Sequence, residues 1–553
     1  MSTDLFARHR ALLERAVQAL DARTHWSPYP ESPSPKTYGE EAAAQGRAAF
    51  QSYLGKDFPL NQPGQTGLHG GERSPWGVPL DVRYPVCDPE QLVAAAQAAM
   101  PAWQRLGPDG RAGILAEALQ RLNQRSFEVA HAVMMTSGQA WMMAFQAGGP
   151  HAQDRGLEAL AGAWRAQTAV QREALWEKPQ GKGEPLRMAK RFEPVGRGVA
   201  LVIGCATFPT WNTYPGLFAA LATGNPVLLK PHRDAILPAA ITVAVLREVL
   251  TEQGVDPNVV MLAVAPLRNA TQALATHPGV RSIDYTGGST FGQWLIDNAR
   301  QAQVYAELAG VNTVVIESTD AYRAMLKNMA FTVSLYSGQM CTTTQAFIVP
   351  AGGIDTDEGH KSYDDVCADF AQAIDTLLAD PKTAHALLGA IQSEDTVRRI
   401  ADAPRLGTVV RASQPLPHPE FEAARVQTPL LLACDARDEA AYMEERFGPI
   451  SFIVRADDAD AAIALSRRIA LDHGALTSGV YSTRPEFVDA MVEASWDAKV
   501  ALSINLTGAV FVNQSSAFSD FHATGGNPAS NASYTDAAFV ANRFRVVQRR
   551  WHV

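Results

Sequence analysis

Short apolar runs separated by longer amphipathic segments dominate the middle of the chain. Residues 198–204 and 226–230 have the composition of buried strands, residues 238–254 form a helical pattern that ends at Gly254, and residues 259–264 return to an apolar run. Strands that alternate with helices in this order form parallel sheets, because parallel strands need a crossover connection. The pattern therefore predicts an α/β domain built on a parallel sheet.

A second series of the same kind starts at residues 312–317. It continues through an apolar run at 346–349, a helical segment at 364–379 and two strands near residues 450 and 478. We therefore expect an α/β protein with two doubly wound parallel-sheet domains. The last apolar run, FRVVQRR, follows the second series without a local partner. We expect this strand to pair elsewhere in the fold or with another subunit.

The N-terminal part of the chain has a different pattern. It begins with an amphipathic helix over residues 1–20, but as a whole it is polar and rich in proline and glycine, so we expect an extended surface arm. From Asp88 a helical periodicity runs to about residue 170, and the charged segment after it suggests a protruding hairpin. The expected divisions are an extension and arm at 1–85, a domain at 86–305 with the hairpin at 173–192, a second domain at 306–512, and a return segment with the terminal strand at 513–553.

Composition places the chain among large globular proteins. Of its 553 residues 46% are hydrophobic and 19% are charged, and the net charge of −9 argues against a nucleic-acid-binding protein, which would need a basic face. No apolar run approaches the roughly 18 residues of a membrane span, and the N-terminus lacks the apolar core of a signal peptide. The five cysteines show no paired spacing, which suits a reducing, cytoplasmic setting. The histidines show no metal-ligand spacing, so we expect no metal.

Four short motifs stand in order along the two series. NPVLLKPHRD ends a predicted strand at Lys230, and YTGGSTFG places Gly287 and Gly292 where a strand meets a helix. ELAG carries Glu307, and SGQMC carries Cys341, which lies 34 residues further on. Each motif alone is weak, since glycine pairs often only form turns and free cysteines are usually buried hydrophobes. The order and the spacing together are more specific.

With the later segment EERFGPISF, these motifs resemble the aldehyde dehydrogenases over roughly residues 85 to 550. The resemblance implies an aldehyde dehydrogenase-like fold in which the first domain binds NAD or NADP and the second carries the nucleophile. It also implies a small β arm that forms a homodimer or a dimer of dimers, and a small-molecule aldehyde as the substrate. The GxGxxG fingerprint and the P-loop are both absent.

The resemblance also implies which residues bind the cofactor. Lys230 would hydrogen-bond the adenosine ribose, and the glycines would let the start of a helix lie close to the pyrophosphate. Glu445 and Phe447 match residues that hold the nicotinamide ribose and pack on the ring. The full implied set is Lys230, Pro231, Arg233, Thr286, Gly287, Gly288, Gly292, Leu308, Glu445 and Phe447.

Cys341 and Glu307 match the nucleophile and the general base of the family. An aldehyde must become tetrahedral before it releases hydride, and a thiolate attacks strongly near neutral pH. The oxyanion that forms needs aimed donors, for which the Cys341 backbone N–H is one candidate. A carboxylate beside the resulting thioester can take a proton from water and drive hydrolysis. The resemblance assigns that role to Glu307.

Three features depart from the family pattern. The position of the family's oxyanion asparagine falls near Thr207, so the nearest asparagine, Asn212, is the candidate donor, with an ordinary turn residue as the alternative. Arg233 stands where many members have a glutamate that reads the ribose hydroxyl, which favours NADP. The threonines after Cys341 resemble the acylating branch, which releases its thioester to coenzyme A. That branch usually lacks the glutamate, so Glu307 favours hydrolysis to the free acid.

Within the family, FPTWNTYPGLFAALATGN and FHATGGNPASNASY most resemble the phenylacetate-degradation enzymes of the PaaN type. The implied substrate is a ring-opened semialdehyde carried as a coenzyme A thioester. Three alternatives stay open: a coenzyme A-acylating dehydrogenase, a nucleotide-independent thiol esterase, and a scaffold that has lost catalysis. Trp211, Tyr214 and Phe518 are candidate aromatics of the substrate pocket.

Overall fold

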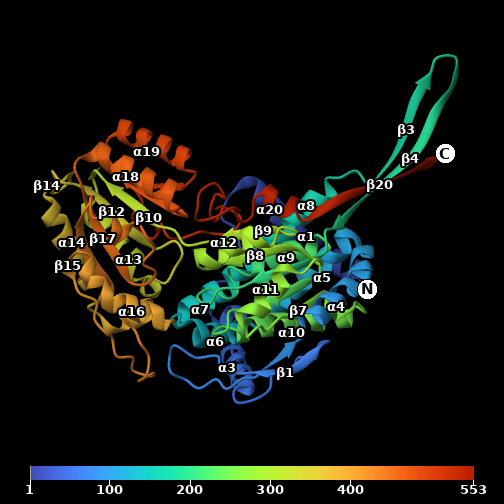
Figure 1. The fold of residues 1–553 in the computed structure, drawn as a ribbon, viewed down its shortest axis with the longest axis horizontal. Helices are drawn as coiled ribbons and strands as arrows, with labels where there is room; N and C mark the ends of the chain where they lie inside the picture. The colour runs from blue at the N-terminus through green and yellow to red at the C-terminus, as the bar shows by residue number, and fades with distance from the viewer. Residues whose placement is uncertain (1) are drawn as a thin grey trace.

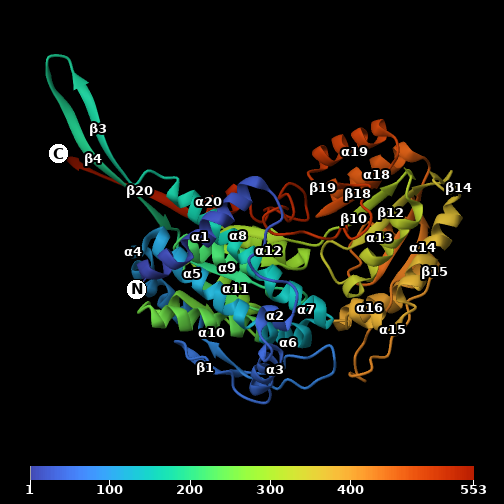
Figure 2. The ribbon, with the colours of Figure 1, turned by 180° about the vertical axis from the view of Figure 1, so that it is seen from behind.

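The computed structural model describes residues 2–553 and has three parts in a row (Figure 1). A domain built on a seven-stranded sheet lies at one end, a domain built on a five-stranded sheet lies in the middle, and a long hairpin projects from the other end. The view from behind in Figure 2 shows the same separation of the hairpin from the two domains. None of the helices over residues 2–553 combines the length and apolarity needed to cross a membrane.

The first sheet is parallel and has the order β7-β6-β5-β8-β9. Because the order reverses beside β5, the carboxyl ends of β5 and β8 form the kind of switch point at which α/β proteins bind ligands. The alternating strands and helices predicted from the sequence are confirmed here. The strands are β5 (Val199–Ile203), β6 (Val227–Lys230), β7 (Val260–Leu262), β8 (Val280–Thr286) and β9 (Gln303–Glu307).

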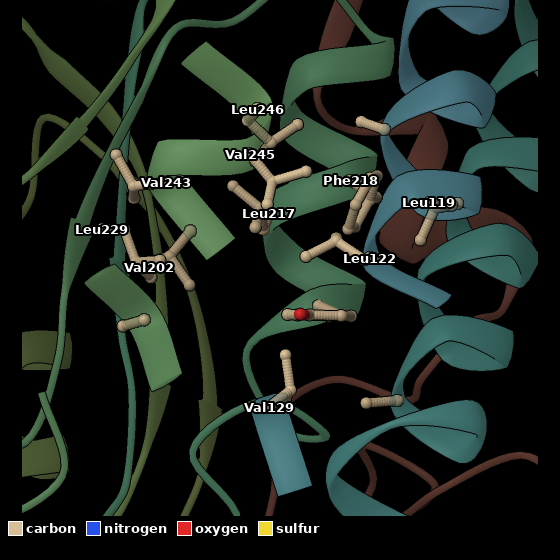
Figure 3. Close-up of a cluster of buried hydrophobic side chains, with 14 of the residues drawn as sticks. Leu119, Leu122, Val129, Val202, Leu217, Phe218, Leu229, Val243, Val245 and Leu246 are labelled. Carbon is tan, nitrogen blue, oxygen red and sulfur yellow. The ribbon is translucent and has the colours of Figure 1, made fainter. Parts of the chain in front are cut away.

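Helices cover this sheet and bury its apolar strands. In Figure 3, Val202 and Leu229 from adjacent strands lie on one side of Leu217, and Leu119 and Leu122 from α5 lie on the other. Fully burying one such side chain stabilises the fold by about 1.5–3 kcal/mol. The helices are α4 (Pro89–Arg105), α5 (Gly107–Gln124), α6 (Ser126–Ser137), α7 (Trp141–Gly148), α8 (Pro150–Thr168), α9 (Tyr214–Ala222), α10 (Leu237–Glu252), α11 (Arg268–Thr276) and α12 (Ser289–Asn298).

The N-terminal residues do not form the extended surface arm expected over 1–85. Helix α1 packs on α5 and α8, and its Leu13 and Ala16 are fully buried in the core of the first domain. Proline and glycine are frequent here because the segment turns repeatedly, not because it projects into solvent. The amphipathic helix predicted at the start of the chain is confirmed. The elements are α1 (Ser2–Ala22), α2 (Pro35–Tyr38), α3 (Ala42–Tyr53), β1 (Gln65–His69) and β2 (Tyr84–Cys87).

The second domain has a seven-stranded sheet in the order β15-β16-β17-β12-β10-β18-β19, in which only the edge pair β15–β16 is antiparallel. Its strands are β10 (Asn312–Ile316), β12 (Thr344–Pro350), β15 (Thr408–Arg411), β16 (Leu430–Asp435), β17 (Ile450–Ala456), β18 (Thr477–Tyr481) and β19 (Ala501–Ile504). A small sheet of β11 (Ser318–Thr319), β13 (Ile354–Thr356) and β14 (Gly359–Lys361) lies beside it. Its helices are α13 (Tyr322–Ser334), α14 (Tyr363–Leu378), α15 (Pro381–Leu387), α16 (Glu394–Asp402), α17 (Glu439–Tyr442), α18 (Ala459–Asp472) and α19 (Pro485–Ala498).

The projecting arm joins two distant parts of the chain. The charged segment after the first helices folds as the hairpin of β3 (Glu173–Gln180) and β4 (Gly183–Gly196), and the terminal strand β20 (Phe544–His552) pairs antiparallel with β4. The expectation that this strand pairs elsewhere is therefore confirmed, and its partner is the hairpin of the same chain. A short helix, α20 (Ala537–Ala541), leads into β20.

Candidate active site

Cys341 lies in a loop that connects α13 to β12, just before the amino end of that strand. The turn before it needs three consecutive residues with positive φ, at Tyr336 (55°), Ser337 (50°) and Gly338 (65°). The loop is held from below by the buried Asn312, whose Nδ2 donates to the carbonyl oxygens of Cys341 (2.8 Å) and Thr343 (3.0 Å). This side-chain amide ties the loop to the start of β10 and fixes where the thiol points.

Glu307 ends strand β9 and is buried, with 4% of its surface exposed. The C-terminal return segment pairs with this strand end: Leu308 N–H donates to Ala529 O (2.7 Å), and Ala306 N–H donates to the side-chain oxygen of Asn531 (2.7 Å). Glu307 therefore has a position set from both sides, by the sheet and by the return segment.

The return segment also brings His522 to the two catalytic candidates. His522 Nε2 lies 3.1 Å from Glu307 Oε2 and 3.9 Å from Cys341 Sγ. Asn212 Nδ2 donates to the same Glu307 oxygen at 3.4 Å. The other oxygen, Glu307 Oε1, is buried and has no hydrogen-bond partner among residues 2–553. One carboxylate oxygen is thus held by two donors, while the other is left available as a base.

The sequence analysis did not identify His522, because it lies 181 residues from Cys341 in a segment considered only for its resemblance. Its ring stands edge-on to Trp211 with centroids 4.8 Å apart, and on its other side it lies 5.6 Å from the ring of Tyr534. Packing between two aromatic rings restricts the orientation of the imidazole. A carboxylate oxygen of Glu307, the Sγ of Cys341 and a ring nitrogen of His522 all lie within 4.8 Å of one another.

The thiol is in an environment that favours its neutral form. Burial raises the pKa of Cys341 well above the usual value, and the nearby Glu307 carboxylate raises it further. A second thiol, Cys205, donates to Asn212 Oδ1 at 3.6 Å, and burial raises its pKa to about 11. Because a thiolate is the stronger nucleophile, attack by Cys341 needs a proton acceptor close by. Glu307 is the carboxylate whose hydrogen bond and charge act on this thiol.

A cavity of about 780 Å³ leads to these residues. Cys341, Asn212 and His522 lie in its wall, and the remaining surface is largely apolar, with side chains that include Met142, Phe208, Trp211, Phe331 and Leu377. The size is within the range of a typical small-molecule site. Of the three predicted pocket aromatics, Trp211 lines the cavity. Tyr214 is instead buried in the core, where its hydroxyl hydrogen-bonds the hydroxyl of Thr242. Phe518 does not line the cavity but packs against Trp26, which does.

The predicted cofactor residues gather along the carboxyl edge of the first sheet. Lys230 ends β6, Thr286 ends β8, and Gly288 caps α12 at the switch point. Gly292 has room for no side chain, because an added Cβ would lie 2.0 Å from a methyl group of Leu308. Pro231 follows Lys230 and is buried. Burial and the neighbouring Arg233 lower the pKa of Lys230 to about 8.

The second domain contributes Glu445 and Phe447 from the loop that follows α17. Gln345, four residues after Cys341, holds this loop: its Nε2 donates to Glu444 O (2.8 Å), and its Oε1 accepts from Arg446 N–H (2.6 Å). Gly310 N–H reaches Glu445 Oε1 at 3.5 Å. Burial raises the pKa of Glu445 to about 7. Gln345 is a positioning residue that the sequence analysis did not single out.

These features fit a dinucleotide. A helix start at a switch point provides backbone donors for a pyrophosphate. At Gly288 an added Cβ would meet nothing within 4 Å, so the space in front of α12 is open. Lys230, at the end of β6, offers a donor, and Glu445, in the loop after α17, offers an acceptor. The residues present are thus those that would hold the two riboses and the pyrophosphate of NAD(P).

Comparison with known proteins supports this interpretation. The chain is 54% identical to an NAD-dependent aldehyde dehydrogenase from Burkholderia multivorans, with 99% of each chain covered and a TM-score of 0.98. It is 28% identical to a vanillin dehydrogenase from Pseudomonas fluorescens over 68% of this chain and 74% of that protein. It is 23% identical to a 1-pyrroline-5-carboxylate dehydrogenase from Bacillus mycoides (strain KBAB4) over 85% of this chain and 89% of that protein. The aldehyde dehydrogenase family profile matches residues 85–545, and the chain therefore belongs to the aldehyde dehydrogenase family.

Proposed function

We propose that this enzyme oxidises an aldehyde to the free carboxylic acid with NAD(P), through a thioester on Cys341 that is hydrolysed with Glu307 as the general base. The observation that carries the proposal is the state of the Glu307 carboxylate. Its Oε2 accepts from His522 and Asn212, whereas its buried Oε1 has no partner among the described residues. An oriented and desolvated carboxylate beside the nucleophile is suited to proton abstraction from water.

The order of steps follows from these contacts. Cys341 Sγ attacks the aldehyde carbon, and its proton passes to Glu307. The backbone N–H of Cys341 has no acceptor among residues 2–553, so it is free to donate to the oxyanion. Bound NAD(P) supplies the hydride acceptor. Glu307 returns the thiol proton to solvent through the cavity before the second half-reaction. After hydride leaves, the carbon is held as a thioester, and Glu307 Oε1 takes a proton from the water that attacks it. The C–S bond then breaks, the carboxylic acid leaves, and the Cys341 sulfur takes a proton back from Glu307.

We assign Asn212 a double role in this scheme. Its Nδ2 lies in the cavity wall, from which it can reach a substrate oxygen, and in the absence of substrate it donates to Glu307. Cys205 fixes the amide orientation by donating to Asn212 Oδ1. An Asn212→Asp variant tests this role, because a carboxylate cannot donate to an oxyanion: we expect kcat to fall and inactivation by iodoacetamide to remain.

His522 is proposed as a positioning residue for Glu307. Its Nε2–H donates to Glu307 Oε2 and leaves Oε1 without a partner among the described residues. His522 can affect the rate without contacting the substrate carbon, because the orientation of the Glu307 carboxylate determines how well it activates water.

The mode of thioester release is tested by product analysis. We expect NAD(P)H and the free acid to form from an aldehyde without coenzyme A. Product formation that requires added coenzyme A and gives an acyl thioester would instead establish the acylating alternative. Ester cleavage at an unchanged rate without nucleotide would establish the thiol esterase. Nucleotide binding without any aldehyde turnover would establish the scaffold.

For the cofactor, we propose NADP in preference to NAD. The Arg233 side chain is 74% exposed and contacts only the adjacent Asp234 (3.4 Å), so it is free to meet a 2′-phosphate beside Lys230. An Arg233→Glu variant should raise KM for NADP by roughly tenfold, the loss of about one charged contact. The KM for NAD should stay within about twofold. Equal KM changes for both nucleotides would refute the preference.

For the substrate, we propose a coenzyme A-linked semialdehyde of aerobic aromatic degradation, on the basis of the motif resemblance. No lysine or arginine of residues 2–553 lines the cavity, so the phosphates of such a thioester would lie outside it, with the semialdehyde chain inside. A substrate screen tests this class against aromatic aldehydes such as vanillin, the substrate in the name of the Pseudomonas relative. Higher kcat/KM for an aromatic aldehyde would overturn the proposal.

We further propose a cytoplasmic homodimer or dimer of dimers assembled through the arm. Five unpaired cysteines suit a reducing compartment. The arm exposes a group of apolar side chains that a partner could cover: Leu175, Leu186, Val546, Val547 and Trp551. Sedimentation analysis of a Trp551→Glu variant tests this assembly, since an unchanged molecular mass would argue against the arm as the interface.

A further inference from the structure

The N-terminal segment between α1 and α2 forms part of the wall of the active-site cavity. This is the same cavity that contains Cys341 and His522, and the segment lines it with His25, Trp26, Ser27, Tyr29, Pro30 and Glu31. The segment is docked on the C-terminal return segment, because Trp26 meets Phe518 edge-on at 5.0 Å and the Arg23 guanidinium lies 3.8 Å from the ring centroid of Phe521. The two ends of the chain thus build one wall together.

Two polar atoms in this wall lack partners. Tyr29 Oη and Asp154 Oδ1 are buried and have no hydrogen-bond partner among residues 2–553, and each residue has only 5% of its surface exposed. Both residues line the cavity. Leaving a buried hydroxyl and a buried carboxyl unsatisfied is unfavourable for folding, so such groups in a binding cavity indicate a ligand that completes their hydrogen bonds.

The chemistry of these two groups restricts what they can bind. Burial raises the pKa of Asp154 well above its usual value, although its hydrogen bond with Ser27 acts in the opposite direction. Burial also raises the pKa of Tyr29. Burial therefore favours the neutral form of both groups, in which each can donate as well as accept. In the same wall, His151 and Glu31 already hydrogen-bond each other (2.8 Å).

An anionic substrate tail has no matching partner here. No lysine or arginine of residues 2–553 lines the cavity, and the rest of the lining near the thiol is mainly apolar, as at Met143, Phe208 and Leu387. A purely apolar tail would leave both polar atoms unsatisfied. The complementary group is an uncharged oxygen function.

We propose that Tyr29 and Asp154 form a specificity site for an uncharged hydroxyl or carbonyl oxygen at the end of the substrate remote from the aldehyde. The site rests on the proposed oxidation at Cys341, because it is defined relative to an aldehyde bound there. The N-terminal segment then selects the substrate by hydrogen bonding, while the apolar lining accepts the connecting chain. Sites built to bind a substrate hydroxyl discriminate strongly against analogues that lack it.

The test compares aldehydes in matched pairs. kcat/KM is measured for n-alkanals from butanal to decanal and for their ω-hydroxy derivatives of equal length. At the lengths that reach the site, we expect the hydroxylated member to be favoured by roughly tenfold or more. Tyr29→Phe, which removes one oxygen and keeps the ring, should bring the ratio close to one. Asp154→Leu should do the same. Tyr481→Phe, whose hydroxyl bonds to Leu506 O outside the cavity, serves as the matched control.

The outcomes separate this site from the proposed reaction. If wild-type enzyme turns over both members of every pair equally, or if Tyr29→Phe leaves the ratio unchanged, the specificity site is refuted while aldehyde oxidation stands. If no aldehyde of either kind yields NAD(P)H, the proposed reaction itself fails. Should Asp154→Leu not fold, Tyr29→Phe alone decides the matter.

Discussion

Replacing His522 by phenylalanine removes the ring nitrogen that holds Glu307 while keeping an aromatic ring between Trp211 and Tyr534. Nε2 lies 3.1 Å from Glu307 Oε2, a hydrogen bond to a charged group that contributes about 1.5–3 kcal/mol. If the whole of this energy orients the base for hydrolysis, the rate of that step falls by roughly 10- to 150-fold. Asn212 still reaches the same oxygen at 3.4 Å, so we expect a loss at the lower end of this range.

The affected step can be separated by rapid-mixing kinetics that follow NAD(P)H. In the first half-reaction the Cys341 thiol needs only an acceptor for its proton. In hydrolysis the Glu307 carboxylate must also be oriented toward the attacking water. We therefore expect His522→Phe to keep a first-turnover burst of NAD(P)H and to lose steady-state rate. His522→Gln, which restores an N–H donor, should recover part of kcat. His360→Phe, a substitution of an exposed histidine of the second domain, should leave both phases unchanged.

Two results would refute the positioning role of His522. Wild-type steady-state turnover in His522→Phe would show that the contact with Glu307 does not matter for hydrolysis. Equal loss of the burst and of the steady state, without rescue by His522→Gln, would show that the residue acts in acylation or only in folding. Circular dichroism and nucleotide binding of each variant exclude global unfolding as the cause.

Three further predictions follow from buried charges. The Glu307 carboxylate raises the pKa of the Cys341 thiol. Glu307→Gln should therefore lose aldehyde turnover but react faster with iodoacetamide, and the pH midpoint of its alkylation should shift to lower pH. An unchanged or higher midpoint would contradict this. Glu445 has its pKa raised from 4.5 to about 7, so its contribution to stability is present below about pH 4.5 and is lost as pH rises through about 7. Glu445→Gln should therefore lose less stability than wild type between about pH 5 and 8, as urea unfolding would show, and parallel pH profiles would exclude the effect. The fully buried Arg543 forms two hydrogen bonds with Asp284, so Arg543→Met should lower the free energy of unfolding by about 3–5 kcal/mol, whereas an Arg543→Met, Asp284→Leu pair should recover much of the loss.

The fold could be predicted well because its sheets are fully buried. Strands such as β5 and β6 are covered on both faces, so they appear in the sequence as continuous apolar runs, and the helices between them impose parallel pairing. The N-terminal region was predicted wrongly for the opposite reason. Its apolar residues are spread along an amphipathic helix and between turns, and only contact with α5 and α8 buries them.

The candidate site could be predicted only where its residues lie within motifs. Glu307 ends a predicted strand and Cys341 precedes another, so their pairing could be inferred from the order and spacing of the motifs that carry them. His522 lies in an irregular segment with neither periodicity nor motif chemistry of its own. Its place is set by backbone bonds with Tyr534 and by the pairing of the return segment with β9, which are long-range contacts without a local signal. The same holds for Tyr29, which reaches the cavity only through docking of Trp26 on Phe518.

The residues that would bind the nucleotide and those of the hydrolytic cluster come from parts of the chain with different connectivity. The proposed nucleotide-binding edge is largely built from residues between Lys230 and Leu308, within one sheet whose strands are local in sequence. The hydrolytic cluster additionally needs His522 from the return segment, and the cavity wall needs both ends of the chain. Closing such long loops costs conformational entropy, which is offset by the burial of residues such as Phe518 and Tyr534 in the core of the first domain. Loosening the return segment should therefore abolish hydrolysis and substrate selection while nucleotide binding persists, which makes the two properties separable by mutation.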